Sequence, residues 1–444
     1  MGREFDAVII GAGAAGYSAG VHIARLGGKV ALVERENVGG LCVHFGCIPT
    51  KVLVAMGRTM LEIKQAQRRG VISKLVSYSP SEADAWRERV VRRFAKAVEA
   101  NLSKEGVEVI KGIAFIDTPH RVIVEEEGGG KRVLEGRNVV IASGSSAIRP
   151  SSIAQDGEVS TSKEVFEWRK VPQSLAVIGG GYIGAEFACV FNALGAEVYL
   201  IEKLERILAT EEEEVSREIE GIMSKRGVHI FTETTLTKME KKEGKVYLRI
   251  LEKGKAREIE VERVLLAVGR QARFDAHSLE RIGVEFDEKG IKTDLRMRTN
   301  IEGIYAIGDV TGRFMLANVA CKEGIVAAEN IMGKEREIDY SNIPNCIFTI
   351  PEIASVGKRE GRSGKAFFSA NAKANAQGET EGWVKVYVHN QRFVGASVIG
   401  PEASSLIVIL QLFLGERIER IREAIIPHPS FPEVIWEAIA QVDK

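Results

Sequence analysis

The feature that most constrains the fold of this chain is a glycine-rich segment that occurs twice. In the first copy an apolar run, Ala7–Ile10, leads into the spacing Gly11-x-Gly13-x-x-Gly16, a helical pattern, a second apolar run and then Glu34. A strand, this loop and a helix, in that order, form the dinucleotide-binding fingerprint. Gly11 makes the turn, Gly13 lets the backbone approach a pyrophosphate, and Gly16 lets the helix pack on the strand. Glu34 can accept hydrogen bonds from ribose hydroxyls.

The second copy repeats this order of elements at Gly179, Gly181 and Gly184 and ends at Glu202. The acid follows the first glycine by 23 positions in each copy (34 − 11 and 202 − 179). One such glycine pattern is a weak signal, but two in the same context predict two bound dinucleotides. Glu202 would repel a 2′-phosphate and bind a free ribose, which favours NAD over NADP. The nearby Lys203 and Arg206 temper this preference without reversing it.

The composition is that of a globular protein without an electrostatic signal for a polyanionic partner. Lys and Arg number 61, as do Asp and Glu, so we expect neither nucleic acid nor an anionic membrane as partner. At roughly 100–200 residues per domain, 444 residues predict two to four domains. The longest apolar stretch, Leu406–Leu414, is too short for a bilayer, which takes about 20 residues. Five cysteines do not make a disulfide scaffold and the first residues show no leader, so we expect a cytoplasmic protein.

Two of the five cysteines, Cys42 and Cys47, lie close together in the segment GGLCVHFGCIPTK. With His44 they offer three metal ligands, but a closed zinc site usually needs four in paired short spacings, which disfavours metal. In a regular helix, residues five apart have Cα atoms about 8.6 Å apart, whereas a disulfide needs at most about 6.8 Å. A bridge would therefore need a distorted turn, which Gly46 and Pro49 permit. A pair held in that way would be reducible and suited to redox work.

The last third of the chain has a different pattern. From about Ser341 there are short strand-like runs, CIFTI, GWVKVYV and FVGASVI, and helical stretches near Ser404–Leu414 and Ile418–Ile425. This pattern predicts an α+β domain with an antiparallel sheet. Earlier in the chain, Glu211–Glu214 follow Thr210, and we expect them to form a solvated first helical turn with an N-cap.

The cysteine segment, placed after the first fingerprint, resembles the redox-active motif of the FAD-dependent pyridine nucleotide–disulfide oxidoreductases, whose usual form is close to GGTCxNxGCxPxK. The resemblance extends over essentially the whole chain, through IASGS, LLAVGRQ, GIYAIGDVTGRFMLANVACKEG, IFTIPEIASVG, GASVIGPEASSLI and HPSFPE. It implies an α/β fold with two Rossmann-like dinucleotide-binding domains, for FAD and NAD, and a C-terminal α+β dimerisation domain. The implied segments are 1–150 and 271–335 for FAD, 151–270 for NAD and 336–444 for dimerisation.

The resemblance also implies roles for individual residues. Cys47 would face the flavin and Cys42 would be the interchange thiol that the substrate attacks. His428, oriented by Glu433, would move the proton and would come from the other subunit of a homodimer. The FAD contacts would be Gly11, Gly13, Gly16, Glu34, Lys51, Ser143, Gly144, Asp309 and Ala317, and the NAD contacts Gly179, Gly181, Tyr182, Gly184, Glu186, Glu202 and Gly269.

Two of these contacts carry a more specific expectation. Lys51 is expected near the reactive edge of the flavin, paired with Glu186. Tyr182 matches a ring that gates the nicotinamide pocket in some relatives, although a core aromatic is an equally open reading.

Within the family, the motifs point to the dihydrolipoamide dehydrogenases. The chain has the intact cysteine pair, shows no vicinal cysteines in its final residues EAIAQVDK, and carries Glu202 for NAD. The expected reaction is oxidation of dihydrolipoamide, free or as a protein-bound lipoyl group, with NAD+. Alternatives are an NAD(P)H-dependent reductase of another small disulfide or acceptor, and a non-enzymatic flavin redox sensor. His44, Phe45 and Asn318 depart from the usual motif residues, which leaves the substrate open.

Overall fold

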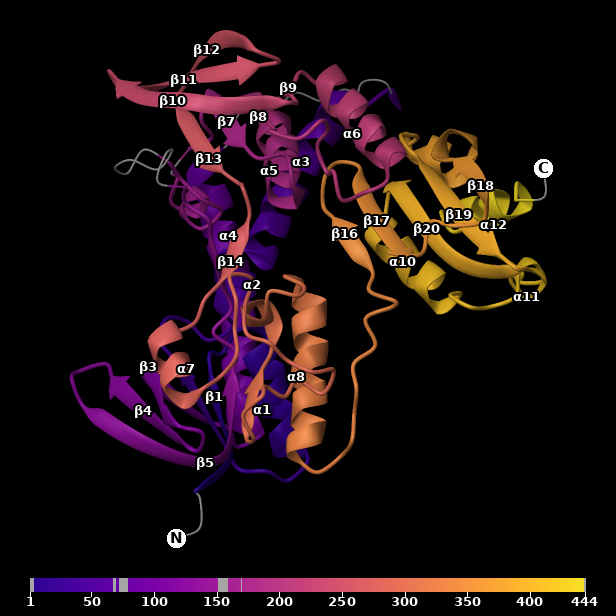
Figure 1. The fold of residues 1–444 in the computed structure, drawn as a ribbon. Helices are drawn as coiled ribbons and strands as arrows, with labels where there is room; N and C mark the ends of the chain where they lie inside the picture. Colours follow the sequence, from indigo (N-terminus) through magenta and orange to yellow (C-terminus); the bar gives the residue numbers. More distant parts are fainter. Residues whose placement is uncertain (1–3, 67–68, 72–78, 151–158, 169, 443–444) are drawn as a thin grey trace. The chain divides into compact units, whose positions relative to one another are not determined.

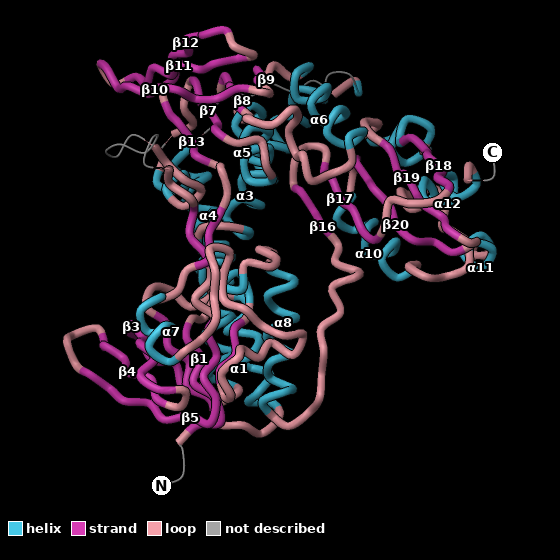
Figure 2. The backbone as a smooth tube through the Cα atoms, in the orientation of Figure 1, coloured by secondary structure: helices cyan, strands magenta, loops and turns pink. Residues whose placement is uncertain are grey.

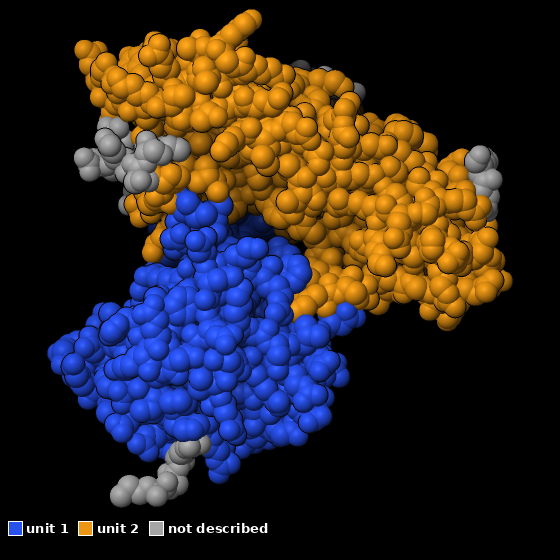
Figure 3. Space-filling view, viewed as in Figure 1, with its two compact units in different colours: residues 1–52, 81–148, 269–339 blue, residues 53–80, 149–268, 340–444 orange. Residues whose placement is uncertain are grey.

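The structure is a computed structural model of the chain, and it describes residues 4–66, 69–71, 79–150, 159–168 and 170–442. The chain forms two compact units, drawn in blue and orange in Figure 3. Unit 1 comprises Met1–Val52, Ser81–Ile148 and Gly269–Asp339, and unit 2 comprises Leu53–Pro80, Arg149–Val268 and Tyr340–Lys444. Each unit is therefore assembled from three separate stretches of sequence.

The centre of unit 1 is a six-stranded sheet. Its strands are β1 (Phe5–Ile10), β2 (Val30–Glu34), β3 (Glu108–Thr118), β4 (Arg121–Glu126), β5 (Lys131–Ile141) and β15 (Ile304–Ala306). β1 runs parallel to β2 and β5, and β15 runs parallel to β5, whereas β4 is antiparallel to both of its neighbours. β1 and β2 are almost entirely buried, which is why FDAVII and VALVE read as continuous apolar runs.

Helices cover this sheet and position the first fingerprint. α1 (Ala14–Arg25) follows β1 and packs beside α8 (Ala317–Ile331), as Figure 1 shows. The approach is close at Gly324, where an added Cβ would lie 2.5 Å from the carbonyl oxygen of Ala15. The remaining elements are α2 (Gly40–His44), the start of α3 (Cys47–Ala66), α4 (Pro80–Lys104), α7 (Ala276–Ile282), and the antiparallel pair β6 (Ser145–Ala147) and β14 (Arg270–Ala272).

Unit 2 contains a second, smaller parallel sheet around the second fingerprint. Its order is β13 (Arg263–Leu266), β7 (Ser174–Ile178), β8 (Glu197–Ile201) and β9 (His229–Phe231), all parallel. The fingerprint helix is α5 (Tyr182–Ala193), and α6 (Glu213–Lys225) lies between β8 and β9 in the chain. An antiparallel sheet of β10 (Thr234–Lys242), β11 (Lys245–Glu252) and β12 (Lys255–Val261) follows. The recurrence of the strand–loop–helix unit in both sheets confirms the α/β prediction.

The last part of unit 2 is an antiparallel five-stranded sheet with helices packed on it. Figure 2 shows its strands in magenta: β16 (Asn345–Ile347), β17 (Glu352–Gly357), β20 (Arg392–Gly400), β19 (Trp383–His389) and β18 (Arg362–Phe367). The helices are α9 (Ala372–Gln377), α10 (Ala403–Leu412), α11 (Ile418–Arg422) and α12 (Glu433–Ala440). The predicted α+β architecture is confirmed, although β17, β18 and α12 were not predicted.

The expectation for Glu211–Glu214 is wrong in its first half. α6 begins only at Glu213, with Glu212 as its N-cap, so just Glu213 and Glu214 lie in an exposed first turn. Glu211 is 4% exposed and accepts hydrogen bonds from residues far away in sequence, such as Ser355 at 3.0 Å. A run of identical acids gives no sign of which one is buried, because the partners come from another part of the fold.

One helical stretch, Gly40–Ala66, is long and apolar enough to cross a membrane by length and composition, among the described residues. It is broken at Phe45 and Gly46, where α2 ends and α3 begins. Within unit 2, Arg58 of α3 forms an ion pair with Glu352 at 2.5 Å.

Candidate active site

The first glycine loop has the geometry that a dinucleotide phosphate requires. Gly11 has φ +105° and donates its N–H to the carbonyl oxygen of Val33 at 2.8 Å. A Cβ at Gly16 would lie 1.9 Å from the carbonyl oxygen of Gly11, so only glycine lets α1 approach β1 here. Gly13 caps α1, and a Cβ there would meet no atom within 4 Å. The helix N-terminus therefore presents free N–H groups to open space, which fits a pyrophosphate.

The second glycine loop has nearly the same backbone geometry as the first. Gly179 has φ +104° and donates to Ile201 at 2.8 Å, and a Cβ at Gly184 would lie 1.8 Å from the carbonyl oxygen of Gly179. Gly181 caps α5 with φ −72° and ψ −171°, against −70° and −173° at the first cap. The internal repeat seen in the sequence is thus a repeat of backbone geometry as well.

The two fingerprint acids are also held alike. Glu34 accepts from the N–H of Ala12 at 2.8 Å and from the N–H of Glu36 at 2.7 Å. Glu202 accepts from the N–H of Gly180 at 2.5 Å and from the N–H of Leu204 at 2.7 Å. Each acid is 9% exposed, and each carboxylate oxygen has a further lone pair for a hydroxyl group. Both acids are therefore preset as acceptors beside their loops.

Arg206, which could have offered a charge to a 2′-phosphate, is turned back onto its own loop. Its Nη2 atom donates to the carbonyl oxygen of Ala209 at 2.8 Å and to that of Glu211 at 3.4 Å. The guanidinium therefore braces the segment before α6. This arrangement turns the Arg206 charge away from the Glu202 carboxylate, while Lys203 stays exposed.

The two cysteines lie on either side of a helix break. α2 ends at His44, Phe45 has φ −138°, and Cys47 begins α3, which confirms the predicted distortion. The two thiols are in hydrogen-bonding contact, and this contact, followed by burial and the charge of Cys47, raises the pKa of Cys42. The pair thus favours a state in which Cys42 keeps its proton.

The surroundings of the pair bear on the metal alternative. The Nε2 atom of His44 is 2.9 Å from the carbonyl oxygen of Val38, so the ring is engaged with the backbone. Within the described ranges, no group of three or more His, Cys, Asp or Glu side chains is arranged to hold a metal ion. Lys51, one turn into α3, belongs to unit 1, whereas its predicted partner Glu186 belongs to unit 2.

A second polar cluster in unit 1 surrounds Asp309. Asp309 lies in the 3₁₀ turn Gly308–Thr311 and accepts a hydrogen bond from the hydroxyl of Ser145. Arg270 in turn donates to that hydroxyl at 2.9 Å and to the Ser145 carbonyl oxygen at 2.8 Å. Burial lowers the pKa of Arg270, and the charge of Asp309 opposes this effect. Ser145 and Arg270 were not predicted as site residues, although they stand in the motifs IASGS and LLAVGRQ.

Three further residues of unit 1 that were predicted to contact FAD are Ser143, Gly144 and Ala317. The hydroxyl of Ser143 donates to the carbonyl oxygen of Arg273, and the N–H of Arg273 donates to Gly144 at 2.9 Å. Ala317 is the first residue of α8. Gly269, predicted to contact NAD, has φ +118° and belongs to unit 1, unlike the other predicted NAD residues.

His428 and Glu433 form a hydrogen-bonded pair in unit 2. Nδ1 of His428 is 2.7 Å from Oε1 of Glu433, while Oε2 accepts from the N–H of Ser430 at 2.6 Å. The bond from His428, and then that from Ser430, lowers the pKa of Glu433. The carboxylate therefore holds the imidazole with its proton on Nδ1, so that Nε2 is the proton acceptor. The His428 side chain is 71% exposed.

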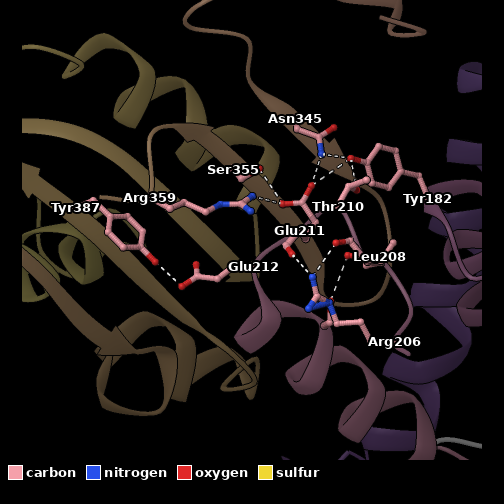
Figure 4. A network of polar contacts seen from close by, with 12 residues as sticks. Tyr182, Arg206, Leu208, Thr210, Glu211, Glu212, Asn345, Ser355, Arg359 and Tyr387 are labelled. Atoms are coloured by element: carbon pink, nitrogen blue, oxygen red, sulfur yellow. Dashed lines mark hydrogen bonds and ion pairs between the residues drawn. The ribbon is translucent and has the colours of Figure 1, made fainter. Parts of the chain in front are cut away.

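The remaining predicted residues of unit 2 lie on α5. Tyr182 is its first residue, and its hydroxyl meets Thr210, Glu211 and Asn345 in the network drawn in Figure 4. Glu186, one turn further, is 9% exposed and accepts from the N–H of Phe348 at 2.8 Å. Glu211 was not predicted as a site residue, because nothing distinguishes it from the other glutamates of the EEEE run.

Comparison with known proteins extends over the whole chain. A family model described as pyridine nucleotide-disulphide oxidoreductase matches residues 5–324, and the family's dimerisation domain matches residues 343–439. The dihydrolipoyl dehydrogenase of Bacillus subtilis is 34% identical over 97% of this chain and 97% of its own length. That of Chlamydia trachomatis is 35% identical over 100% of this chain and 98% of its own.

Solved structures agree with these sequence matches. LpdA from Mycobacterium tuberculosis superposes with a TM-score of 0.90 at 26% identity, covering 98% of this chain and 99% of that one. The Cu(II) complex of the HOCl-induced flavoprotein disulfide reductase RclA from Escherichia coli has a TM-score of 0.88 at 27% identity, covering 100% of both chains. With both glycine loops, the cysteine pair and the matched dimerisation domain in place, this chain belongs to the pyridine nucleotide-disulphide oxidoreductase family.

Proposed function

We propose that this flavoprotein disulfide oxidoreductase, which uses FAD and NAD, oxidises dihydrolipoamide or a protein-bound dihydrolipoyl group with NAD+. The observation that carries the proposal is the contact between the Cys42 and Cys47 thiols at the break between α2 and α3. Two thiols in contact can form a disulfide with little movement, and a dithiol substrate can exchange with it. The name dihydrolipoyl dehydrogenase, borne by relatives that align over nearly the whole chain, supports the choice of substrate.

The proposed reaction at the cysteine pair proceeds by two successive thiol–disulfide exchanges. A substrate thiolate attacks Sγ of Cys42, the Cys42–Cys47 bond breaks, and Cys47 leaves as a thiolate. The second substrate thiol then displaces Cys42, which takes up a proton as the substrate disulfide forms. Two electrons and two protons leave the substrate; NAD+ takes up a hydride and one proton passes to solvent. Bound FAD supplies the two-electron relay between the cysteine pair and NAD.

The proton transfers are assigned to His428. With Nδ1–H held by Glu433, Nε2 accepts the proton of the attacking thiol and returns it to Cys42. We propose that His428 acts on the cysteine pair of a second protomer. The match of residues 343–439 to the dimerisation domain supports this homodimer, as do the exposed apolar side chains Leu412 and Ile425 in the same region.

The cofactor contacts follow the two fingerprints. For FAD we propose residues 1–150 and 271–335, with contacts from Gly11, Gly13, Gly16, Glu34, Lys51, Ser143, Gly144, Asp309 and Ala317. For NAD we propose residues 151–270, with contacts from Gly179, Gly181, Tyr182, Gly184, Glu186 and Glu202, and with Gly269 at the boundary. The inward-turned Arg206 supports a preference for NAD over NADP.

The proposal is tested by anaerobic titration of two samples of the purified protein, one with NADH and the other with dihydrolipoamide. We expect each reagent to bleach the flavin absorbance, and four electrons to be taken up per subunit, two by the flavin and two by the disulfide. Uptake of only two electrons would contradict a working cysteine pair. Failure of lipoamide to turn over with NADH would exclude this substrate while leaving the family assignment intact.

A second candidate is an NAD(P)H-dependent reductase of another small disulfide or acceptor. The match to the flavoprotein disulfide reductase RclA over the whole chain favours it, as do His44 and Phe45 between the cysteines. In the same titration, reduced protein would then be reoxidised by another low-molecular-weight disulfide and not by lipoamide.

The Gly184→Ala variant is expected to weaken NAD+ binding by about tenfold or more while leaving the FAD content unchanged. The added Cβ would lie 1.8 Å from the carbonyl oxygen of Gly179, so the second loop must shift, and the first loop is not touched. Isothermal titration with NAD+ and the flavin absorbance measure the two effects. Gly221→Ala is the matched control, because its Cβ meets no atom within 4 Å. Equal NAD+ affinity in both variants would contradict the assignment of this loop.

A further inference from the structure

The hydroxyl of Tyr182 is held at three points. It lies 3.0 Å from Oγ1 of Thr210, 3.0 Å from Nδ2 of Asn345 and 3.2 Å from Oε1 of Glu211 (Figure 4). Tyr182 follows Gly181 directly and opens α5, so its ring stands at the helix end that faces a bound pyrophosphate. The Tyr182 hydroxyl is therefore held by side chains that lie outside the glycine fingerprint.

Glu211 is the centre of this arrangement. Its side chain is 2% exposed, and its carboxylate accepts from Asn345 at 2.6 Å, Ser355 at 3.0 Å and Arg359 at 2.6 Å, as well as from Tyr182. A buried carboxylate persists only if it is paired and hydrogen-bonded, and here Arg359 supplies the opposite charge. Burial and the charge of Glu211 raise the pKa of Tyr182, so the hydroxyl keeps its proton and donates it.

The partners of Glu211 come from two parts of unit 2. Asn345 lies on β16, Ser355 lies on β17 and Arg359 follows that strand, while Tyr182 belongs to the fingerprint helix of the parallel sheet. The antiparallel sheet of the dimerisation domain therefore reaches the first residue of α5 directly through Asn345 and also through the Glu211 carboxylate. A carboxylate can join the antiparallel sheet to the segment before α6 without contacting Tyr182.

The adjacent Glu212 makes such a tie. It pairs with Lys385 at 2.6 Å and accepts from the hydroxyl of Tyr387, both on β19 of the same antiparallel sheet. Figure 4 shows the two neighbouring acids pointing to different partners. Glu212 thus provides a matched comparison, because it pairs with another strand of the same antiparallel sheet, β19, without touching Tyr182.

We propose that Glu211 is a positioning residue for the nicotinamide half of NAD(H): it fixes the Tyr182 ring and so links the nicotinamide site to the dimerisation domain. This inference rests on the proposed binding of NAD at Gly179–Gly184. It predicts an effect on one half-reaction only, since Glu211 acts through Tyr182 and not through the cysteine pair. Dithiol oxidation by the protein should not depend on Glu211.

The test compares Glu211→Gln, Tyr182→Phe, the double variant and Glu212→Gln in the FAD-loaded protein. Isothermal titration gives the dissociation constant of NAD+, and stopped-flow absorbance gives the rates of flavin reduction by NADH and by dihydrolipoamide. We expect Glu211→Gln and Tyr182→Phe each to weaken NAD+ binding and slow reduction by NADH by about tenfold, the loss of one hydrogen bond to a charged group. Reduction by dihydrolipoamide should stay within about twofold of wild type.

The double variant and the control decide between positioning and general loosening. If Glu211 acts through Tyr182, the double variant is no worse than either single one, because the second change removes nothing further. Glu212→Gln should leave NAD+ binding unchanged. The inference is overturned if the Glu211→Gln and Tyr182→Phe effects multiply, if Glu212→Gln weakens NAD+ binding equally, or if both half-reactions slow together.

Two further outcomes are informative. Should Glu211→Gln fail to fold, Tyr182→Phe alone still tests the inference, and unchanged NAD+ binding in that variant would overturn it. Absence of NAD+ binding to the wild-type protein would instead refute the proposed function, and the two failures are thereby distinguished.

Discussion

Replacing Cys42 with serine is expected to reduce dihydrolipoamide oxidation with NAD+ by a factor of about 10³ or more. Serine cannot form a disulfide with Cys47, so the substrate finds no sulfur to attack. The flavin should still be reduced by NADH, because the second glycine loop is unaffected. Steady-state assay with lipoamide and anaerobic titration with NADH measure the two activities separately.

Cys189→Ala is the control for the cysteine variants. Cys189 lies within α5, is 6% exposed, and burial raises its pKa to about 11, so it supplies no thiolate for exchange. This variant should keep near-normal turnover and titrate with four electrons per subunit, whereas Cys42→Ser should take up two. Normal lipoamide turnover by Cys42→Ser would refute the assignment of the interchange thiol.

The second large effect is expected for His428→Ala, which should lower dithiol turnover by about 10²- to 10⁴-fold, the usual contribution of a positioned acid–base group. The Glu433 carboxylate holds Nδ1 of the His428 imidazole. Loss of the imidazole leaves the proton of the attacking thiol without its proposed acceptor. Reduction of the flavin by NADH should again be retained. Stopped-flow measurement of both half-reactions checks this result.

Glu433→Gln should give a smaller loss than His428→Ala, because an amide can still contact the ring but cannot stabilise its charged form. The pKa of Glu433 is lowered in the folded protein, so the carboxylate is present at any pH above its ordinary range. Its stabilising effect is lost only as the pH falls through that lowered pKa. Turnover of the wild-type protein should therefore not fall through loss of the Glu433 carboxylate at any pH above that lowered pKa, and a pH profile of kcat/KM checks this.

His389→Ala serves as the control for the acid–base variants. His389 lies exposed at the end of β19 in the same antiparallel sheet, away from the proposed dyad in sequence. Both half-reactions should be unchanged in it. A loss equal to that of His428→Ala would show that the effect comes from disturbing the dimerisation domain and not from a lost proton acceptor.

Local features were predictable because they depend on neighbours in the chain. The spacing of Gly11, Gly13 and Gly16 determines a strand–turn–helix in which backbone contacts exclude a Cβ at Gly11 and Gly16, and the same spacing recurs from Gly179. The break between Cys42 and Cys47 followed from helix geometry in the same way. The His428–Glu433 pair spans only five residues, so a motif sufficed to indicate it.

Long-range contacts decided the rest. Glu211 stands in a run of four glutamates, and its burial depends on Ser355 and Arg359, which a different sheet supplies. Ser145, Arg270 and Asp309 likewise meet only when three distant segments of unit 1 assemble. Hydrophobic period and glycine spacing report on a residue's own strand or helix, whereas a buried charge is stabilised by whichever partners the fold brings to it. The amino-acid sequence alone therefore determined the two dinucleotide folds and the redox motif, and the tertiary structure decided which carboxylate holds Tyr182.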